Sequence, residues 1–489
     1  MNRPLKPSTL FLLTLATLLI LGAVSLILNQ FPIQFFGTTI TLPHPISMFQ
    51  KDSVSYTNID TLVTNVLKEI ETEEPVLQID SVPNDTIIEP ILPQKTEEKI
   101  DTVRVIATTI QQRIHKLQFP PDNPKIMESF YNALRTETGK RNIRILHYGD
   151  SQIEGDRLTG YIRNRFQKRF GGSGPGLLLC DKPIADHATI NQKASDDWKR
   201  DNVMQKKDTV ANAIGYGIMG QTNQFSAIPP NKAWLSYELS NLSYHSARKY
   251  NRCRLFIGHS ETPLDIEIYG GDSLLMKDQI QLEEPLNVFG FQIDNTPNDI
   301  VFKFESEQSP SFYALSLDQI SGISVDNIPW RGSSGAEFSL IEQQLLSYFF
   351  KQINVRLIVF QFGVNIVPNV VKGYKWYEEL LVQQLQHLRK AAGDTPIIVV
   401  GVSDMSRKKD TWYESYPNIP AIRDAQRNAA FRTGCAFWDL YEAMGGKNSM
   451  PSWVFAQPPL ARTDFVHFNP RGGRIVAHMF YEALMHNYK

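Results

Sequence analysis

Two short segments, far apart in the sequence, carry residue types suited to acyl transfer from an ester. Ser151 lies in a Gly-Asp-Ser turn that ends a strand-like apolar run starting at Ile143, and a helix-like pattern follows. Such a turn exposes a serine hydroxyl at the rim of a parallel sheet, beside backbone N–H groups that can bind an oxyanion. Downstream, Asp464 and His467 supply a carboxylate and an imidazole in an Asp-x-x-His segment. Together these residues predict a serine esterase.

The sequence contains a second Gly-Asp-Ser triplet, so the triplet alone does not identify the nucleophile. Gly271-Asp272-Ser273-Leu274 matches the familiar four-letter motif literally, but alternating runs flank it on both sides. The pair of glycines at 270 and 271 predicts a tight hairpin turn between two strands. No helix follows it, so we assign the nucleophile to Ser151 and not to Ser273.

Four segments, in order along the chain, resemble the four conserved blocks of the SGNH (GDSL-type) hydrolases. They are Tyr148–Ser151, Trp330–Ala336, Gly363–Asn365 and Asp464–His467. The resemblance covers about 120–180 and 320–489. Ile366 stands where the third block usually has an aspartate, a departure that leaves Asn365 in place.

The resemblance implies a role for each matching residue. Ser151 would be the nucleophile and donate one backbone N–H to the oxyanion, and His467 would be the base. The second N–H would come from Gly335, because Gly-Ala is expected to open a helix there, with Gly332 as the alternative. The side chain of Asn365 would complete the oxyanion hole.

Asp464 can orient the imidazole of His467, since a catalytic histidine needs its other ring nitrogen held. Some of the matching residues also have a purely structural interpretation. Taken alone, however, His467 would also suit the N-terminus of a helix before Pro470, and Asn365 would suit a turn after a buried strand. Their joint order at strand ends favours the catalytic interpretation, because open α/β sheets bind ligands there.

Helical and continuous apolar patterns alternate in the parts of the chain that hold the four segments. This alternation predicts a parallel sheet covered by helices on both faces, a three-layer α/β/α domain that the resemblance identifies as SGNH-type and flavodoxin-like. We expect strands at 143–148, 355–362, 396–400 and 435–438, with helices near 124–138, 158–170, 340–348, 381–388, 423–431 and 471–485.

Between these parts, the sequence consists of short runs in which apolar and polar residues alternate, such as Leu264–Tyr269 and Val301–Glu305. Short strands separated by Gly, Asn, Pro and Asp predict an antiparallel β-sandwich or jelly roll. We therefore expect a hydrolase domain formed by 119–180 and 320–489, with a β domain at 181–319 inserted into it.

The N-terminus has the composition of an export segment. Arg3 and Lys6 precede an uncharged apolar run from Pro7 to Asn29, which is long enough to span a bilayer. A cleavable signal peptide is the competing interpretation, but its apolar region is usually shorter. We expect an uncleaved transmembrane anchor at 1–30, with the body in the periplasm. Residues 31–118 are expected to form a flexible acidic, proline-rich stalk.

Charge and cysteine content restrict the partners. The 50 Lys+Arg nearly balance 51 Asp+Glu, so no basic field is available to bind nucleic acid. Cys180, Cys253 and Cys435 are too widely spaced for a zinc site of the CxxC type. We expect catalysis without a metal or another cofactor.

A β domain inserted between the first two blocks of an exported SGNH protein resembles the arrangement of bacterial peptidoglycan O-acetylesterases. That resemblance implies removal of acetyl groups from peptidoglycan or another O-acetylated polysaccharide through an acetyl-serine intermediate. Two alternatives stay open. One is an SGNH-type glycan O-acetyltransferase, which shares the acyl-enzyme. The other is a non-catalytic glycan-binding surface protein, in which Trp198, Trp234, Tyr237 and Tyr244 could stack on sugars.

Overall fold

The computed structural model describes residues 7–30, 33–35, 38–40, 54–73, 116–181, 188–204, 215–225 and 231–489. They divide into two units, Met1–Ser55 and Tyr56–Lys489. The first unit contains helix α1 (Pro7–Gln30) and the hairpin of β1 (Ile33–Phe35) and β2 (Thr38–Ile40). No helix among the described residues combines the length and hydropathy needed to cross a bilayer, so the predicted transmembrane anchor finds no support here.

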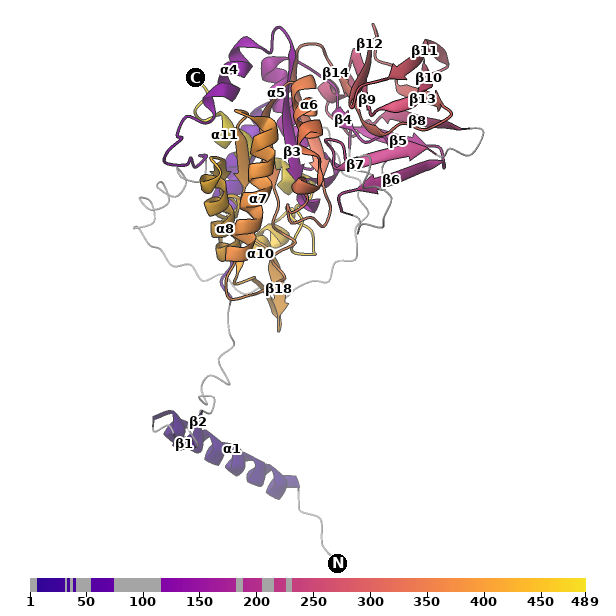
Figure 1. The fold of residues 1–489 in the computed structure, drawn as a ribbon. Coiled ribbons are helices and arrows are strands. Elements are labelled where there is room, and N and C mark those ends of the chain that lie inside the picture. The colour runs from indigo at the N-terminus through magenta and orange to yellow at the C-terminus, as the bar shows by residue number, and fades with distance from the viewer. Residues whose placement is uncertain are drawn as a thin grey trace, which may run out of the picture. The chain divides into compact units, whose positions relative to one another are not determined.

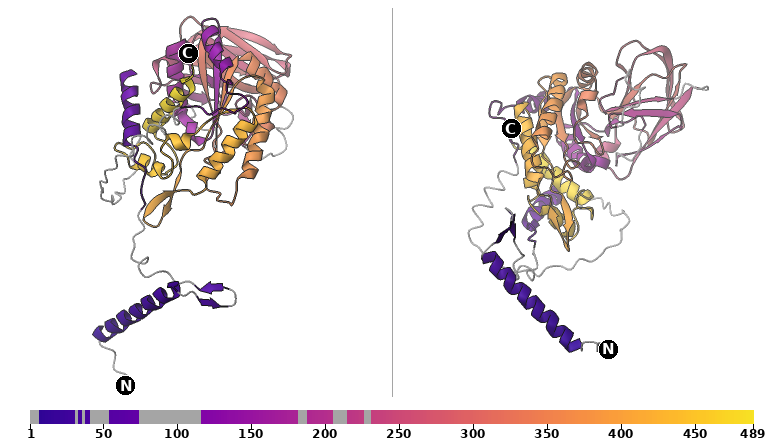
Figure 2. Two further views of the ribbon diagram at one scale, coloured as in Figure 1. Left: turned by 90° about the vertical axis from the view of Figure 1, so that its left-hand side faces the viewer. Right: turned by 60° about the horizontal axis from the view of Figure 1, so that its bottom comes forward.

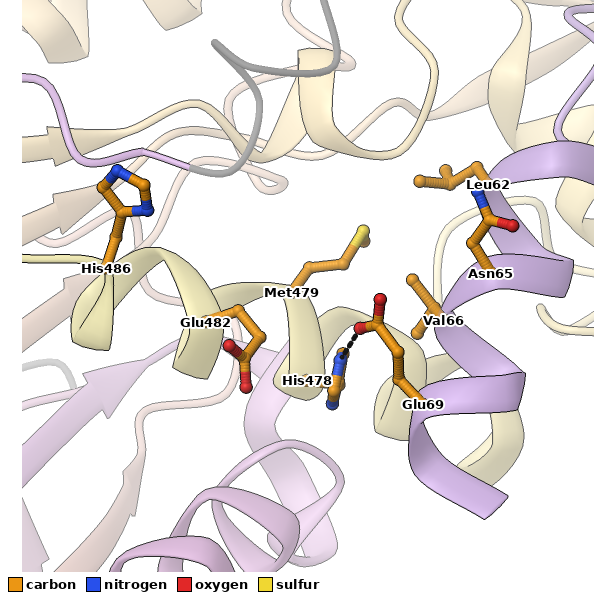
Figure 3. A pocket seen from close by; sticks show the side chains of 8 residues that line it. All are labelled: Leu62, Asn65, Val66, Glu69, His478, Met479, Glu482 and His486. Atoms are coloured by element: carbon orange, nitrogen blue, oxygen red, sulfur yellow. Dashed lines mark hydrogen bonds and ion pairs between the residues drawn. The ribbon is translucent and has the colours of Figure 1, made fainter. Parts of the chain in front are cut away.

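Part of the predicted flexible stalk is an ordered helix of the second unit. Helix α2 (Asp60–Glu73) buries Val66 and Ile70 in the same core cluster as the last helix, α11 (Pro470–Met485). Glu69 Oε2 lies 2.7 Å from Nε2 of the buried His478, as Figure 3 shows. The prediction of a stalk is thus wrong over 60–73, because the apolar positions there follow a helical period. Residues 74–115 lie outside the described part.

A five-stranded parallel sheet forms the centre of the second unit (Figure 1). Its order is β15-β3-β16-β17-β20, which is the 2-1-3-4-5 order of flavodoxin-like folds. The first strand in the chain therefore lies between the next two. The strands are β3 (Asn142–Gly149), β15 (Gly322–Pro329), β16 (Val355–Gln361), β17 (Ile397–Val400) and β20 (Ala436–Trp438).

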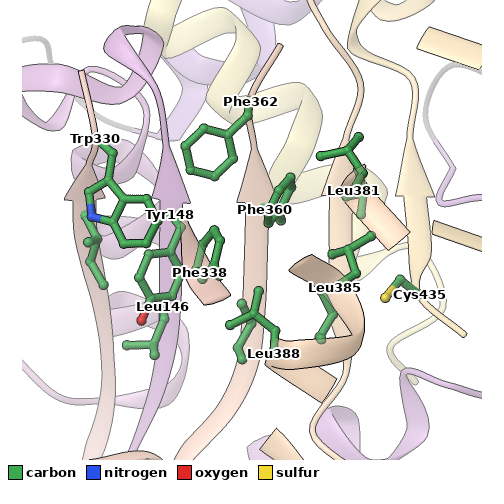
Figure 4. Close-up of a cluster of buried hydrophobic side chains, with 14 of the residues drawn as sticks. Leu146, Tyr148, Trp330, Phe338, Phe360, Phe362, Leu381, Leu385, Leu388 and Cys435 are labelled. Carbon is green, nitrogen blue, oxygen red and sulfur yellow. The ribbon is translucent and has the colours of Figure 1, made fainter. Parts of the chain in front are cut away.

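Both faces of this sheet are buried, as the continuous apolar runs predict. In β16, Leu357 and Val359 face one core cluster, whereas Ile358 and Phe360 face the other. The second cluster also contains Tyr148, Trp330, Phe338 and Phe362, which surround Phe360 in Figure 4. The alternation fixes the register of each strand, since a slip by one residue would exchange the two faces.

Helices cover the two faces and confirm the predicted three-layer arrangement. Helices α6 (Gln343–Gln352), α7 (Lys375–Ala392) and α8 (Ile419–Arg432) pack on one face. The opposite face is covered by α4 (Glu128–Thr136), α5 (Thr159–Phe170), α10 (Ser449–Phe455) and α11, together with the short α9 (Leu440–Ala443).

Two expected helix starts differ from the structure. Helix α4 begins at Glu128 and not at Pro124, because Asn123 and Lys125 accept turn hydrogen bonds through their carbonyl groups before the helix forms. Gly335-Ala336 opens no helix. A short 3₁₀ turn, η4 (Phe338–Leu340), precedes α6 instead.

The inserted domain is the predicted antiparallel sandwich, visible beside the three layers in Figure 2. Two sheets, ordered β11-β10-β13-β8-β5 and β12-β9-β14-β7-β6, enclose an apolar core of their own. The strands are β5 (Ile190–Ala194), β6 (Trp198–Asn202), β7 (Gln221–Phe225), β8 (Lys232–Leu239), β9 (Arg252–Ile257), β10 (Ser260–Gly270), β11 (Ser273–Leu282), β12 (Asn287–Gln292), β13 (Asp299–Glu305) and β14 (Phe312–Asp318). Strand β4 (Gly176–Leu178) also pairs with β14, although we expected the insert to begin at residue 181.

A buried ion network joins the sandwich to the central sheet. Arg144 on β3 is fully buried and pairs with Asp326 on β15 and with Asp318 on β14. Burial opposes ionisation of Asp318, but Arg144, Arg254 and Arg252 hold its pKa well below the ordinary range. Because a buried charge is costly without its partners, this network fixes the two domains to each other.

Candidate active site

The predicted site residues lie beyond the carboxyl ends of three adjacent strands. Ser151 follows β3, Gly332 and Gly335 follow β15, and Asn365 follows β16. Strand β3 lies between the other two, so the point where the strand order reverses falls at Ser151. Ligands of open parallel sheets bind at this point.

Ser151, His467 and Asp464 form a continuous hydrogen-bonded chain. Ser151 Oγ lies 2.8 Å from His467 Nε2, and His467 Nδ1 lies 2.8 Å from Asp464 Oδ2. The side chain of Ser151 is neither buried nor fully exposed. The structure thus brings together the three residues to which we assign nucleophile, base and orienting carboxylate.

The carboxylate of Asp464 is held in its ionised form. Burial acts to raise its pKa, but hydrogen bonds from the imidazole and backbone of His467 and from the backbone of Val466 outweigh burial and lower the pKa to about 2. An ionised Asp464 keeps the proton of the imidazole on Nδ1, which leaves Nε2 as the acceptor facing Ser151.

An unpredicted hairpin supports the turn that carries the histidine. Within this turn, Phe465 has a φ of 58°, which is unusual for a bulky side chain. Its ring stacks on Tyr413 with ring centroids 3.6 Å apart. Tyr413 belongs to β19 (Trp412–Ser415), which pairs with β18 (Ser406–Lys409). The hairpin therefore holds the strained turn. The sequence does not predict this hairpin, because four-residue strands with charged side chains lack a clear pattern.

Two side chains next to Ser151 tie its turn in place, and neither was predicted. Gln152 Nε2 donates to the carbonyl of Val466 at 2.7 Å, which links the serine turn to the histidine turn. Arg157 Nη1 donates to the carbonyl groups of Ser151 and Gln152 at 2.8 and 3.0 Å. Gln152 could have been suspected from its position after the nucleophile, whereas no sequence signal marks Arg157.

Asp150 connects the serine turn to the segment that carries Asn365. Its carboxylate accepts from the backbone N–H of Gln152 at 3.0 Å and from that of Val364 at 3.4 Å. Burial raises its pKa to about 6, although these backbone hydrogen bonds act in the opposite direction. Asp150 therefore positions two parts of the site without facing the substrate itself.

The glycine of the oxyanion hole requires a correction to our first choice. The N–H of Gly335 donates to Ser333 Oγ at 2.8 Å, within its own loop. Among the described residues, no group accepts from the N–H of Ser151 or of Gly332. Gly332 has a φ of 85° with open space where a side chain would be. The geometry now favours Gly332 as the second donor.

Asn365 is exposed and has a donor to spare. Its Nδ2 donates to the carbonyl of Ser333 at 2.7 Å. Because an amide group carries two N–H bonds, one hydrogen bond leaves the second for a ligand. Asn365 can therefore stabilise the loop of Gly332 and also complete an oxyanion hole.

Ser273 and three of the four aromatic residues predicted to stack on sugars lie in the sandwich, away from this site. Ser273 is exposed at the start of β11, where it opposes Gly270 of β10 in the expected hairpin. Tyr237 is 1% exposed in the sandwich core, and Trp198 packs edge-on against core aromatic rings such as Phe312. Trp234 is 38% exposed.

Comparison with known proteins shows that part of the chain is similar to one family. Residues 296–475 match the model of the GDSL-like lipase/acylhydrolase family. The match includes Gly332, Asn365, Asp464 and His467 but not Ser151, which the fold brings to the same place. No curated protein matches the sequence.

One solved structure shares the fold at low sequence identity, and others match with low TM-scores. A peptidoglycan O-acetylesterase structure is 17% identical, with a TM-score of 0.60, over 76% of this chain and 98% of that chain. The shared part exceeds what the hydrolase segments alone can supply, so it extends into the sandwich. An acetyl xylan esterase is 17% identical over 33% of this chain and 81% of its own, with a TM-score of 0.26. The family two carbohydrate esterase from Cellvibrio japonicus is 9% identical over 49% and 85%, with a TM-score of 0.17.

Proposed function

We propose that this serine esterase, which carries a domain of the GDSL-like lipase/acylhydrolase family, removes O-acetyl groups from peptidoglycan or a related cell-envelope glycan. The observation that carries the proposal is the chain of two 2.8 Å contacts from Ser151 through His467 to Asp464. Such a chain activates a hydroxyl for attack on an ester carbonyl.

Acylation begins when Ser151 Oγ attacks the acetyl carbonyl carbon and gives its proton to His467 Nε2. The carbonyl oxygen becomes an oxyanion, which the N–H groups of Ser151 and Gly332 and the amide of Asn365 stabilise. Each such donor lowers the activation barrier by on the order of 3 kcal/mol. When the intermediate collapses, the C–O bond to the sugar breaks and His467 returns the proton to the sugar oxygen.

Deacylation repeats these steps with water as the attacking group. His467 takes a proton from the water, whose oxygen attacks the acetyl-serine carbonyl. The bond to Ser151 Oγ then breaks, the serine recovers its proton from His467, and acetate leaves. The sum of the two halves is hydrolysis of one ester by one water.

The fold shared with a peptidoglycan O-acetylesterase, sandwich included, supports the choice of a glycan ester. The exposed position of the site at the end of the sheet also suits a polymer, because the chain on either side of the ester needs room. Transfer of the acetyl group to a glycan hydroxyl uses the same acyl-enzyme, so the acceptor must be decided by experiment.

A peptidoglycan substrate implies a location outside the cytoplasm. The basic residues and apolar run at the N-terminus led us to expect the cell envelope, with the body in the periplasm. This location stays a prediction, and cell fractionation with immunodetection of the chain will test it.

The experiment is acetate release from purified O-acetylated peptidoglycan, with a parallel assay on p-nitrophenyl acetate. We expect the protein to release acetate from the polymer and the Ser151→Ala variant to release none. A soluble polysaccharide acceptor is added in a second series. Acetate release that is unaffected by the acceptor supports hydrolysis, whereas acetylated acceptor at the expense of acetate would indicate a transferase.

The small ester separates failure of the chemistry from failure of the substrate. Cleavage of p-nitrophenyl acetate without acetate release from peptidoglycan would refute the proposed substrate and retain the esterase. A Ser151→Ala variant that cleaves either compound at the normal rate would refute the nucleophile.

A further inference from the structure

A cavity of about 380 Å³ lies beside the serine turn, between the hydrolase layers and the sandwich. Glu154 and Arg157 from the serine turn and Arg462 from the histidine turn line it. The same two turns carry the triad, and Arg157 itself donates to the carbonyl of Ser151. A group bound in the cavity would therefore belong to the same ligand as an ester at Ser151.

Four arginines line the cavity, namely Arg157, Arg163, Arg462 and Arg474. Only one has a carboxylate partner in the lining, since Arg163 pairs with Asp156 at 2.8 Å. The other acidic residue in the lining is Glu154. Its Oε1 lies 3.6 Å from Nε of Arg331, which does not line the cavity. Within the described residues, Arg462 and Arg474 thus line the cavity without an ion-pair partner, whereas Arg157 donates to backbone carbonyl groups.

The positive charges of two of these arginines act on each other. Burial lowers the pKa of Arg157 to about 10, and the charge of Arg462 acts in the same direction, whereas the nearby carboxylates of Glu154, Asp464 and Asp150 partly oppose it. Arg157 also packs closely against α11. A Cβ atom at Gly473 would lie only 2.6 Å from Arg157 Cγ. Among the described residues, the side chains of Arg462 and Arg474 form no ion pair or hydrogen bond. An anion would relieve this repulsion.

The sandwich contributes another wall of the cavity. Leu242, which is 54% exposed, and Tyr244 line the cavity next to Thr189. Thr189 Oγ1 also donates to Asp156 at 3.0 Å, which fixes this wall to the serine turn. An apolar side chain and an aromatic ring in the same cavity as the arginines suit a sugar ring that carries an anionic group.

We propose that this cavity is a carboxylate-binding subsite, which holds an acidic group of the same glycan whose acetyl ester lies at Ser151. This inference rests on the proposed function, which makes a glycan the ligand. Guanidinium groups bind carboxylates with paired hydrogen bonds, and carboxylates are the anions of muramic acid and its peptide stem. Specificity for acidic glycans thus comes from both domains.

The test compares O-acetylated peptidoglycan with the same material after its carboxylates are converted to methylamides. We expect the wild-type protein to show about a tenfold higher kcat/KM on the intact polymer, the effect of one charge-assisted contact. In Arg462→Gln and Arg474→Gln this ratio should fall to within about twofold, whereas Arg474→Lys, which keeps the charge but loses the paired hydrogen bonds, should show an intermediate ratio.

Arg471→Gln is the matched control. Arg471 lies in the first turn of the same helix and is exposed, but it does not line the cavity. This variant should keep the tenfold ratio. Turnover of p-nitrophenyl acetate and thermal unfolding, measured on every variant, show whether each protein is folded and active.

Equal kcat/KM values of the wild type on intact and amidated polymer would overturn the subsite, as would an unchanged ratio in both glutamine variants. If the polymer is not a substrate at all, calorimetry with Ser151→Ala and a muramyl tripeptide decides the question. Binding that weakens about tenfold in Ser151→Ala/Arg474→Gln supports the subsite although the proposed function has failed. Equal or undetectable binding refutes the subsite.

Discussion

The chain contains Gly-Asp-Ser twice, once at 149–151 and once at 271–273, and the two copies have different structures. The first follows a buried parallel strand and continues into a 3₁₀ helix, η1 (Ser151–Asp156), with Asp150 as its N-cap. The second is a hairpin turn between antiparallel strands, with an exposed serine. The motif itself carries no chemistry, because only the first copy has an imidazole, fixed N–H donors and a cavity around it.

The largest difference between the copies is expected from their serines. Ser151→Ala should lower kcat on p-nitrophenyl acetate on the order of 10⁶-fold, because the attacking oxygen is lost. Ser273→Ala should leave kcat unchanged. A fluorophosphonate probe followed by peptide mapping should label only the peptide with Ser151. Label on Ser273 would reverse the comparison.

The histidine is the second feature that distinguishes the copies. His467→Ala should reduce kcat by nearly as much, on the order of 10⁶-fold, because the nucleophile and its base act as a unit. The variant should also lose the label on Ser151, which makes the two serines equally unreactive. Retention of near-normal kcat, with normal thermal unfolding as the check on folding, would show that another group is the base.

The oxyanion donors give a smaller effect, and they act mainly on the transition state. Asn365→Ala should lower kcat about 10² to 10³-fold with little change in KM. Steady-state kinetics on p-nitrophenyl acetate will separate the two constants. A rise in KM at constant kcat would mean that Asn365 binds the substrate without stabilising the oxyanion.

The smallest effect concerns the aspartates, and it appears as pH-dependent stability. The pKa of Asp150 is about 6 in the folded protein, above its ordinary value of 3.8, so its ionisation opposes folding. The stability it contributes is complete below pH 3.8 and is lost as the pH rises through about 6. Relative to wild type, Asp150→Asn should therefore gain about 2 kcal/mol between pH 4 and pH 7.

Denaturation by urea at the two pH values measures this gain, and Asp272→Asn is the control. Asp272 is exposed in the hairpin, so its variant should keep a constant difference from wild type. A constant difference for Asp150→Asn as well would show that Asp150 is not buried as described.

The fold was largely predictable because its strands are buried on both faces. Uninterrupted apolar runs located β3, β16, β17 and β20 to within about two residues. Elements held by tertiary contacts were not predicted. Strand β4 exists because it pairs with β14, and α2 was assigned to a flexible stalk because acidic residues surround it in the sequence.

In the site, too, residues with a sequence pattern could be predicted and those that depend on tertiary contacts could not. Ser151, Asp464 and His467 could be predicted, because their residue types and order carry the chemistry. The choice between Gly335 and Gly332 could not, since it depends on one hydroxyl, Ser333 Oγ, that occupies the Gly335 N–H. The support from Arg157 and the hairpin around Tyr413 also depends on contacts between distant segments.

The ion network at Arg144 has a consequence for how this protein can be divided. Strand β3 carries Arg144 near its beginning and leads to Ser151 beyond its end, so one rigid strand joins the network to the nucleophile. Excising the sandwich would remove Asp318 and leave a guanidinium in a dry interior with one carboxylate fewer, a defect of several kcal/mol. We therefore expect that the hydrolase half is not a detachable catalytic fragment.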